Sequence, residues 1–427
     1  MNYHVERSSL GGAISVTPSK SHTMRAILLA SMLPGASLIR RPLPSPDTEA
    51  MLAACAALGA RFERRGDALV LTGAGERLAV PSQVIDVGNS GQALRFCAAM
   101  AARLPLYSVF TGDESIRSLR PMQPLLDALT CLGALAVSSR NNGRAPVIIR
   151  GPVRCGRARL EGRDSQPVSA MLMLAAFLPG TTVLEVDNPG ELPWVDLTLR
   201  WLDRLGVSHS SQGHSLYTVS GPARIANMDY TVPGDWSSAA FPLAAALITN
   251  SALTLENMDI HDSQGDKAVL DLWERMGARF TADPTAGTLT VHPHPGLRGA
   301  VLDVNPVIDA LPILAVTACF ARGPTVLTGA AIARSKESDR ISAIAGELAK
   351  MGADIEERED GLLVRPSLLR GAVVHSRRDH RVAMALAVAG LSCGRTVVED
   401  TACVAKSFPG FAAAMRGVGA AVRESGS

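Results

Sequence analysis

The stretch Thr325–Arg365, TVLTGAAIARSKESDRISAIAGELAKMGADIEEREDGLLVR, contains the pattern from which the fold is predicted. Its β-branched start, Thr325–Thr328, predicts a strand. Arg340–Met351 predicts an amphipathic helix that is closed by a glycine. Two short strands are expected at Asp354–Glu357 and Leu362–Arg365, on either side of a polar turn.

A second kind of helix is expected before each such stretch. Met24–Leu33, Ala239–Thr249 and Arg381–Leu391 are rich in Ala, Leu and Met and are apolar nearly all round. A helix without a polar face must be buried on most sides. Each copy of the pattern is therefore expected to run helix, strand, helix, strand, strand, with its sheet outside and its first helix inside.

Two markers show that the pattern recurs along the chain. A hydroxylated residue followed by an aliphatic one starts the first strand at Ser37, Ser108, Thr182, Thr254, Thr325 and Thr396, at separations of 71, 74, 72, 71 and 71 residues. The second marker is a glycine that follows an aliphatic residue or Met and precedes Ala or Val. It recurs in the same phase at Gly59, Gly133, Gly206, Gly277, Gly352 and Gly419. Two markers in one phase predict six copies of the same unit.

The length of 427 residues favours two compact halves of three copies each. We expect an N-terminal lobe at 17–233 and a C-terminal lobe formed by 1–16 and 234–427. The hinge is expected near Pro233–Asp235, where Pro and Gly punctuate the chain. If the buried helices of each half are parallel, their N-termini give the gap between the halves a positive potential suited to anions.

Composition excludes several classes of protein. The net charge of +2 offers no field for nucleic acid or a membrane surface, so neither is expected as a partner. Seven scattered cysteines without a CxxC pair indicate reduced thiols, and neither the cysteines nor the histidines have a spacing that suits a metal. The start lacks a signal-peptide pattern, and no apolar stretch reaches the ~20 residues that span a bilayer. We therefore expect a cytoplasmic protein.

Loops that precede the buried helices carry an unusual set of polar residues. They read TPSKSHTMR (17–25), GNSGQALR (88–95), RDSQ (163–166), NPVID (305–309) and RRDHR (377–381). Three further basic stretches read RSLRP (117–121), RSKESDR (334–340) and AKSFP (405–409). Such a concentration of Lys and Arg beside small polar residues predicts a site for several anionic groups.

These stretches, in this order, resemble the 5-enolpyruvylshikimate-3-phosphate (EPSP) synthases over the whole chain. The resemblance implies a two-domain inside-out α/β barrel with six βαβαββ-type repeats, three per domain. It also implies transfer of the enolpyruvyl group of phosphoenolpyruvate to the 5-hydroxyl of shikimate 3-phosphate by addition and elimination, in chorismate and aromatic amino acid biosynthesis. It implies a monomer without metal or cofactor, which is the target of the herbicide glyphosate.

The resemblance also implies roles for individual residues. Contacts to shikimate 3-phosphate fall on Lys20, Ser21, Arg25, Ser165, Gln166, Asp309 and Lys336. Contacts to phosphoenolpyruvate fall on Lys20, Asn89, Gly91, Arg120, Gln166, Arg340, Arg381 and Lys406. Asp309 would accept the proton of the acceptor hydroxyl, and Glu337, with Lys20, would give a proton to the methylene carbon and retrieve one. His380 is given no catalytic role.

The shikimate phosphate site departs from the family pattern. Asp164 stands where Ser or Ala is common, and it must turn away or pair with Arg163 if a phosphate is to bind beside it. The stretch Gly190-Glu191-Leu192-Pro193-Trp194 lacks the serine that many members use on the same phosphate, and Trp194 replaces a common tyrosine. Arg144 or Arg163 are candidates to compensate for these changes.

Two other functions remain open at this point. An enolpyruvyl transferase for UDP-N-acetylglucosamine shares the fold and the donor, but that family opens with Lys-Asn and carries a loop cysteine. Here Ser21 follows Lys20, and the loop Thr111–Arg120 contains no cysteine. A repeat-built protein that binds anions without turnover would not need the carboxylates of Asp309 and Glu337 among so many anions.

Overall fold

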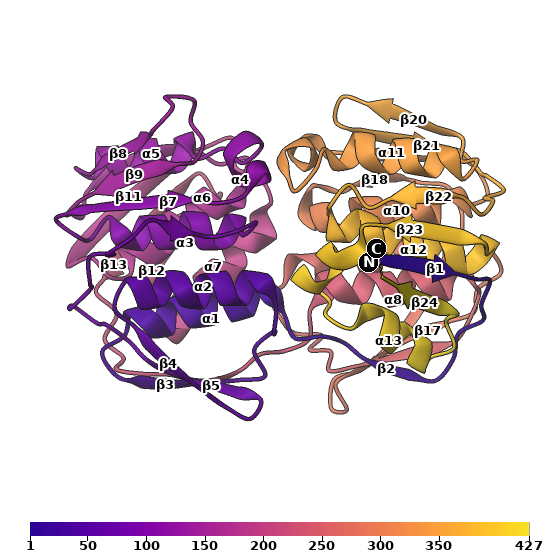
Figure 1. Cartoon of the computed structure of the whole chain (residues 1–427), viewed down its shortest axis with the longest axis horizontal. Coiled ribbons are helices and arrows are strands. Elements are labelled where there is room, and N and C mark those ends of the chain that lie inside the picture. Colours follow the sequence, from indigo (N-terminus) through magenta and orange to yellow (C-terminus); the bar gives the residue numbers. More distant parts are fainter. Residues whose placement is uncertain (427) are drawn as a thin grey trace. The chain divides into compact units, whose positions relative to one another are not determined.

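The computed structural model describes residues 1–426, and these divide into two compact units (Figure 1). Unit 2 is the continuous segment Pro18–Val232, and unit 1 combines Met1–Thr17 with the chain from Pro233 onward. Each unit has its own apolar core, built mainly from Ala, Leu, Val and Met. Among the described helices, none combines the length and the apolar character that would let it cross a bilayer.

Unit 2 contains three four-stranded sheets within the described residues. The first is β14 (Asp229–Thr231), β3 (Ala36–Arg40), β5 (Ala68–Thr72) and β4 (Arg61–Arg65). The second is β6 (Ile85–Asp86), β7 (Tyr107–Thr111), β9 (Val147–Arg150) and β8 (Leu135–Ser138). The third is β10 (Arg157–Glu161), β11 (Gly180–Asp187), β13 (Leu216–Gly221) and β12 (Ser208–Gln212).

Unit 1 contains three more such sheets in its described part. They are β2 (Ala13–Ser15), β15 (Leu253–Glu256), β17 (Thr288–His292) and β16 (Arg279–Asp283); then β18 (Val301–Asp303), β19 (Thr325–Thr328), β21 (Gly361–Val364) and β20 (Ile355–Arg358). The last is β22 (Val373–His375), β23 (Thr396–Glu399), β1 (Asn2–Val5) and β24 (Val422–Ser425).

All six sheets share one topology. The first two strands of each sheet are parallel, and the remaining pairings are antiparallel. The hydroxylated marker residue lies on the second strand in every sheet, from Ser37 on β3 to Thr396 on β23. The prediction of an α/β protein is confirmed, and the structure adds that its sheets are mixed.

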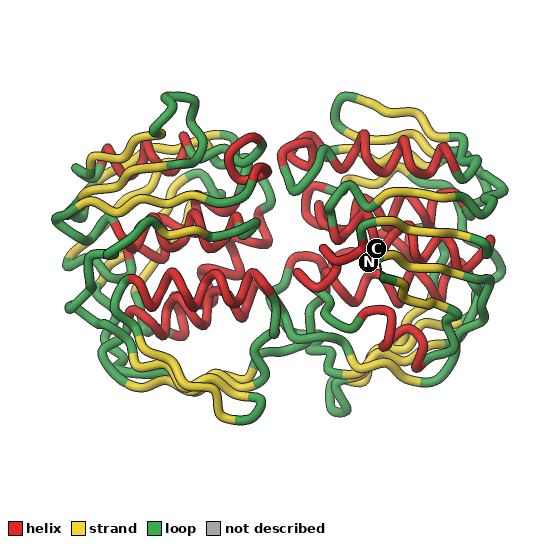
Figure 2. The backbone as a smooth tube through the Cα atoms, viewed as in Figure 1, coloured by secondary structure: helices red, strands yellow, loops and turns green. Residues whose placement is uncertain are grey.

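Six helices are buried along almost their whole length, as their apolar composition predicts. They are α1 (Lys20–Met32), α3 (Gly91–Ala101) and α6 (Ser165–Ala175) in unit 2, and α8 (Trp236–Ile248), α10 (Leu311–Cys319) and α12 (His380–Cys393) in unit 1. Within each unit the strands lie on the outer side of these inner helices (Figure 2). Charged side chains of these helices lie near their N-termini, as Lys20 does in α1, Arg95 in α3 and Arg381 in α12.

The other helices include the amphipathic ones predicted after each first strand. They are α2 (Pro46–Ala57), α4 (Glu114–Ser118), α5 (Gln123–Cys131), α7 (Leu192–Arg204), α9 (Val269–Arg275), α11 (Arg340–Lys350) and α13 (Phe411–Gly417). Short 3-10 helices lie at η1 (Gly265–Ala268), η2 (Asn305–Ala310), η3 (Ala331–Ser335) and η4 (Thr401–Lys406). The marker glycine follows the last helical residue of α2, α5, α7, α9, α11 and α13 by two positions and has a positive φ each time, which confirms its role in ending the helix.

Candidate functional site

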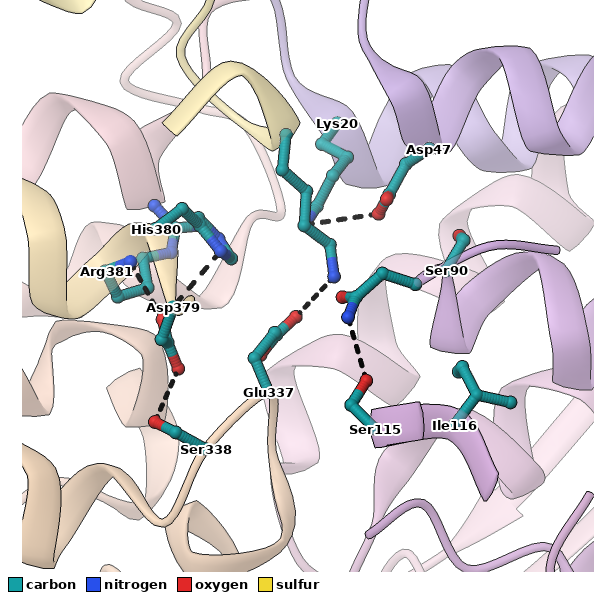
Figure 3. A network of polar contacts seen from close by, with 12 residues as sticks. Lys20, Asp47, Ser90, Ser115, Ile116, Glu337, Ser338, Asp379, His380 and Arg381 are labelled. Atoms are coloured by element: carbon teal, nitrogen blue, oxygen red, sulfur yellow. Dashed lines mark hydrogen bonds and ion pairs between the residues drawn. The ribbon is translucent and has the colours of Figure 1, made fainter. Parts of the chain in front are cut away.

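In unit 2, α1 opens with three of the predicted substrate-binding residues. Ser19 caps the helix, and Lys20 Nζ lies 3.6 Å from Asp47 Oδ2 (Figure 3). Ser21 is buried in the same turn. The ion pair fixes the Lys20 ammonium at the beginning of the helix, where the helix dipole by itself would disfavour a positive charge.

Arg25, the third of these residues, is fully engaged inside unit 2. Its Nε donates to Thr198 Oγ1 at 3.0 Å, and its Nη2 contacts Ser169 Oγ at 3.4 Å and the Trp194 carbonyl oxygen at 3.3 Å. Burial lowers the pKa of Arg25 to about 9. Because Ser169 belongs to α6, this arginine ties the start of α1 to the start of α6.

The first turn of α3 meets the same region. A Cβ on Gly91 would lie 3.0 Å from Arg95 Nη1, 3.4 Å from Gln166 Oε1 and 3.8 Å from Arg120 Cζ. Arg95 Nη1 in turn donates to Gln166 Oε1 at 2.9 Å. The structure therefore brings together Gly91, Arg120 and Gln166, which were predicted to share the phosphoenolpyruvate pocket.

Asn89 lies one residue before the Ser90 cap of α3. Its Nδ2 donates to Asp113 Oδ2 at 2.7 Å and to Ser115 Oγ at 2.8 Å. These bonds hold the Asn89 amide against the loop that begins α4. The side chain is half-buried and occupies a polar rather than an apolar environment.

The sequence left two arrangements open for Asp164, which were a turn away from the phosphate site or a pair with Arg163. Its Oδ2 lies 3.0 Å from Arg95 Nη2, so its partner is Arg95 and not Arg163. Arg163 is exposed and faces Glu161, with 3.5 Å between Nε and Oε1. The reason is geometric: Asp164 caps α6 by accepting from the Gln166 N–H, and this turns its carboxylate inward toward α3.

Glu191 was missed as a functional residue by sequence reasoning, which noted only that serine is absent there. Its Oε2 accepts both the N–H and the hydroxyl of Ser165, each at 3.0 Å. Glu191 is buried, so this carboxylate is an integral part of the α6 N-terminus. A carboxylate two residues before Pro193 at the start of a helix is a signal that could have pointed to it.

In unit 1, Asp309 lies in η2, directly before α10. Its Oδ1 is 2.7 Å from Arg340 Nη1 and its Oδ2 is 3.0 Å from Arg381 Nη2. Both arginines are buried, whereas Asp309 is partly exposed. The starts of α10, α11 and α12 therefore meet at one carboxylate.

Arg340 also contacts two further carboxylates. Its Nη2 lies 2.9 Å from Glu337 Oε2 and its Nε lies 2.8 Å from Asp379 Oδ2. Asp379 additionally accepts from the Ser338 hydroxyl at 3.2 Å (Figure 3). Burial by itself would lower the pKa of Arg340, but its three carboxylate partners outweigh burial and hold that pKa well above its ordinary value.

Glu337 joins the remaining predicted cation of this unit. Lys406 Nζ lies 2.7 Å from Glu337 Oε1, and both side chains are largely buried. Lys336 is buried beside Glu337 in the chain, at the end of η3. The structure thus connects five of the predicted residues of unit 1 through ion pairs: Asp309, Arg340, Arg381, Glu337 and Lys406.

Arg381 has donors that its protein partners do not use. Among the described residues, Nε and Nη1 of this buried guanidinium have no hydrogen-bond partner. Buried guanidinium donors ordinarily find acceptors, so two open ones are consistent with a place for an anionic ligand. This supports the predicted role of Arg381.

Asp266 is a second residue that sequence reasoning missed. It accepts from the Ser237 hydroxyl at the start of α8, and in the described structure its Oδ1 has no hydrogen-bond partner. Burial, and next the charge of Asp309, raise the pKa of Asp266 to about 8. The repeat phase could have found it, because Asp266 follows Thr254 by nearly the interval that separates Lys336 from Thr325.

One group of side chains has the composition of a metal site. Ligand atoms of Glu337, Asp379 and His380 lie within 4.8 Å of one another. Two of these three carboxylate and imidazole groups, Glu337 and Asp379, are already paired with the Arg340 guanidinium. A metal cation would be repelled by that positive charge, so the donor set does not fit a metal.

Comparison with known proteins now identifies the family. The model of the family described as EPSP synthase (3-phosphoshikimate 1-carboxyvinyltransferase) matches residues 5–415. The chain belongs to the EPSP synthase family. The family resemblance seen in the sequence is therefore confirmed.

Individual members of the EPSP synthase family match over nearly the whole chain. The 3-phosphoshikimate 1-carboxyvinyltransferase of Ruminiclostridium cellulolyticum is 41% identical over 416 residues, which cover 97% of this chain and 98% of that protein. The one from Chlamydia muridarum is 43% identical over 417 residues, covering 96% and 93%.

Solved structures extend the comparison to the fold. The EPSP synthase of Acinetobacter baumannii superposes with a TM-score of 0.85 at 28% identity and covers 100% of both chains. The enolpyruvyl transferase NikO from Streptomyces tendae gives a TM-score of 0.80 at 20% identity, covering 100% of this chain and 99% of its own. At that identity NikO shows the shared fold alone.

Proposed function

We propose that this chain is a 3-phosphoshikimate 1-carboxyvinyltransferase, which transfers the enolpyruvyl group of phosphoenolpyruvate to the 5-hydroxyl of shikimate 3-phosphate. Membership of the EPSP synthase family supports the activity. The observation that carries the mechanism is the Asp309 carboxylate between Arg340 and Arg381, because it joins a base to two anion-binding groups.

The first chemical step is an addition. Asp309 accepts the proton of the 5-hydroxyl of shikimate 3-phosphate. At the same time the oxygen of that hydroxyl forms a bond to the central carbon of phosphoenolpyruvate. Glu337, with Lys20, supplies a proton to the methylene carbon, which becomes a methyl group. The product of this step is a tetrahedral intermediate that carries both substrates.

The second step is an elimination. The bond between the central carbon and the phosphate oxygen breaks, and inorganic phosphate leaves with the proton that Asp309 accepted in the first step. A methyl proton returns to Glu337, which restores the carbon–carbon double bond and both side chains. Arg120, Arg340, Arg381 and Lys406 bind the carboxylate and phosphate of phosphoenolpyruvate, because planar guanidinium groups suit both. We assign Asn89, Gly91 and Gln166 of unit 2 to the same donor.

Binding of the donor also explains how Asp309 becomes available. In the described structure both Asp309 oxygens are paired with arginine. When an anionic donor occupies Arg340 and Arg381, it competes with Asp309 for their donors, so the carboxylate becomes free to meet the acceptor hydroxyl. The acceptor, shikimate 3-phosphate, is bound by Lys20, Ser21, Arg25, Ser165, Gln166 and Lys336.

The finer architecture belongs to the same proposal. We assign units 2 and 1 to the N- and C-terminal lobes, with the hinge near Pro233–Asp235, where Asp235 caps α8. The six sheets of one topology and the buried helices support six repeats in an inside-out α/β barrel, three per lobe. We further propose a cytoplasmic monomer that glyphosate inhibits at the phosphoenolpyruvate pocket.

The test is a coupled assay of phosphate release. Release is expected only when phosphoenolpyruvate and shikimate 3-phosphate are both present, and not when UDP-N-acetylglucosamine replaces the acceptor. Release of phosphate with phosphoenolpyruvate and UDP-N-acetylglucosamine, but not with shikimate 3-phosphate, would favour the related transferase. Calorimetric binding of both substrates without any release of phosphate would instead indicate a binding protein without turnover.

A further inference from the structure

The first turn of α6 is already occupied by a carboxylate of the chain itself. Glu191 is only 2% exposed, and its Oε2 accepts the Ser165 N–H and the Ser165 hydroxyl, both at 3.0 Å. The proposed function gives Ser165 to the acceptor, and the family resemblance implies that it belongs to the phosphate site of shikimate 3-phosphate. The donors that would bind this phosphate are therefore engaged by an internal anion.

A second carboxylate strengthens this arrangement. Asp164 Oδ1 accepts the Gln166 N–H at 3.0 Å, while Asp164 Oδ2 pairs with Arg95. The other inner helices of unit 2, α1 and α3, are capped by the neutral hydroxyls of Ser19 and Ser90. The positive end of the α6 dipole thus already faces two carboxylates of the protein, one of which is also paired with Arg95, and this leaves less attraction for a further anion.

The backbone holds Glu191 in this position. Glu191 has a φ of +47°, in the left-handed region, and its carbonyl oxygen accepts the Trp194 N–H at the start of α7. The preceding Gly190 packs so closely on the segment before α6 that a Cβ there would lie 2.8 Å from the Arg163 carbonyl oxygen. A close-packed loop therefore delivers the carboxylate to Ser165.

We propose that Glu191 is a specificity-determining residue that competes with the acceptor's phosphate for the Ser165 donors. The inference rests on the proposed function, because it takes shikimate 3-phosphate as the acceptor. A phosphate dianion and a carboxylate repel each other and need the same N–H and O–H groups. The phosphate must displace Glu191, and this lowers the affinity for a phosphorylated acceptor below that of a chain with a neutral residue at this position.

The variants Glu191→Gln and Glu191→Ser test the competition, and Glu185→Gln is the matched control. Glu185 lies on β11 of the same unit and pairs with Arg157 on the exposed face of the sheet. Isothermal calorimetry should show shikimate 3-phosphate binding about 10-fold more tightly to both Glu191 variants. Shikimate should bind all four proteins within about twofold, because it lacks the phosphate that would compete with Glu191 for the Ser165 donors.

The outcomes separate this inference from the proposed function. Unchanged or weaker binding of shikimate 3-phosphate in both Glu191 variants would overturn the competition, as would an equal gain for shikimate. Failure of the proposed function would appear as no phosphate release by the wild-type chain. The calorimetric comparison does not need turnover. In that case inorganic phosphate serves as the probe, and tighter binding of it to both Glu191 variants than to the wild type would still show that Glu191 competes for the Ser165 donors.

Discussion

Asp309 and Arg381 form an ion pair, with 3.0 Å between Oδ2 and Nη2, in which the carboxylate is partly exposed and the guanidinium is buried. The exposed partner is the one that can meet a substrate hydroxyl, and the buried partner still has donors to offer an anion. In the function proposed above, the pair therefore links binding of phosphoenolpyruvate to release of the Asp309 carboxylate.

Replacing Asp309 by Asn should remove the base and leave the shape of the site. We expect turnover to fall by at least about 10²-fold, because positioned acid–base groups typically supply 10²–10⁴-fold. Phosphate release measures this loss. The exposed Asp271 on α9 gives a matched Asp→Asn control, and equal turnover in the Asp309 variant and the control would contradict the role of Asp309.

Replacing Glu337 by Gln should slow proton transfer at carbon. The Lys406 ion pair at 2.7 Å keeps Glu337 in place, and the amide keeps the shape of the side chain but cannot carry the proton. In deuterated water the variant should incorporate deuterium into the methylene of phosphoenolpyruvate about 10²-fold more slowly. Mass spectrometry of recovered substrate provides the measurement.

The control for this experiment is a lysine–glutamate pair elsewhere in unit 1. Lys350 Nζ lies 2.7 Å from the buried Glu347 Oε2, the same separation as in the Lys406 pair. Lys406→Met should raise the KM for phosphoenolpyruvate, whereas Lys350→Met should not.

Deuterium incorporation at the wild-type rate in the Glu337→Gln variant would show that another group moves the proton.

Replacing Gly91 by Ala should crowd the phosphoenolpyruvate pocket. The new Cβ would lie 3.0 Å from Arg95 Nη1, so that arginine and its partner Gln166 must shift. Overpacking of this kind costs about 1–3 kcal/mol, and we expect the KM for phosphoenolpyruvate to rise about 10-fold. Gly346→Ala on α11, where a Cβ meets nothing within 4 Å, should leave that KM unchanged.

Asp266 should make stability depend on pH. Burial and the charge of Asp309 raise its pKa from 3.8 to about 8, so the folded chain favours the protonated form. The stabilisation is fully present below pH 3.8 and is lost as the pH rises through about 8. Asp266→Asn stays neutral throughout, so the stability of the variant relative to wild type should increase between these limits.

Urea denaturation at a series of pH values measures this effect. The difference in unfolding free energy between Asp266→Asn and wild type should grow from about pH 4 to about pH 8 and then level off. The exposed Asp271→Asn variant should show no such trend. A difference that stays constant over this interval would mean that Asp266 is ionised throughout.

The repeated features of the fold could be predicted because each follows from local chemistry. Helices rich in Ala, Leu and Met have no polar face, and α1, α8 and α12 are buried accordingly. The predicted strands Asp354–Glu357 and Leu362–Arg365 differ by one residue from β20 and β21. Boundaries shift by such amounts because helix and strand ends depend on a few weak hydrogen bonds.

The pairing of charged residues could not be predicted in the same way. The sequence left open whether Asp164 turns away from the phosphate site or pairs with Arg163, and it gave no sign of the partner found, Arg95, toward which the α6 cap turns the carboxylate. Asp266 becomes noticeable only when η1 is packed against Ser237 and near Asp309. Family resemblance assigns residues one position at a time, whereas these relationships depend on which helix starts meet in space.

The position of β1 has a consequence for how the chain folds during synthesis. This strand lies between β23 and β24. Residues Asn2–Val5 can therefore form their sheet hydrogen bonds only after β23 and β24 have been synthesised. Unit 2 is continuous from Pro18 to Val232 and needs no later segment to complete its sheets. On the ribosome unit 2 can therefore acquire its structure while Asn2–Val5 still lacks its neighbours, and unit 1 closes only once β24 has emerged.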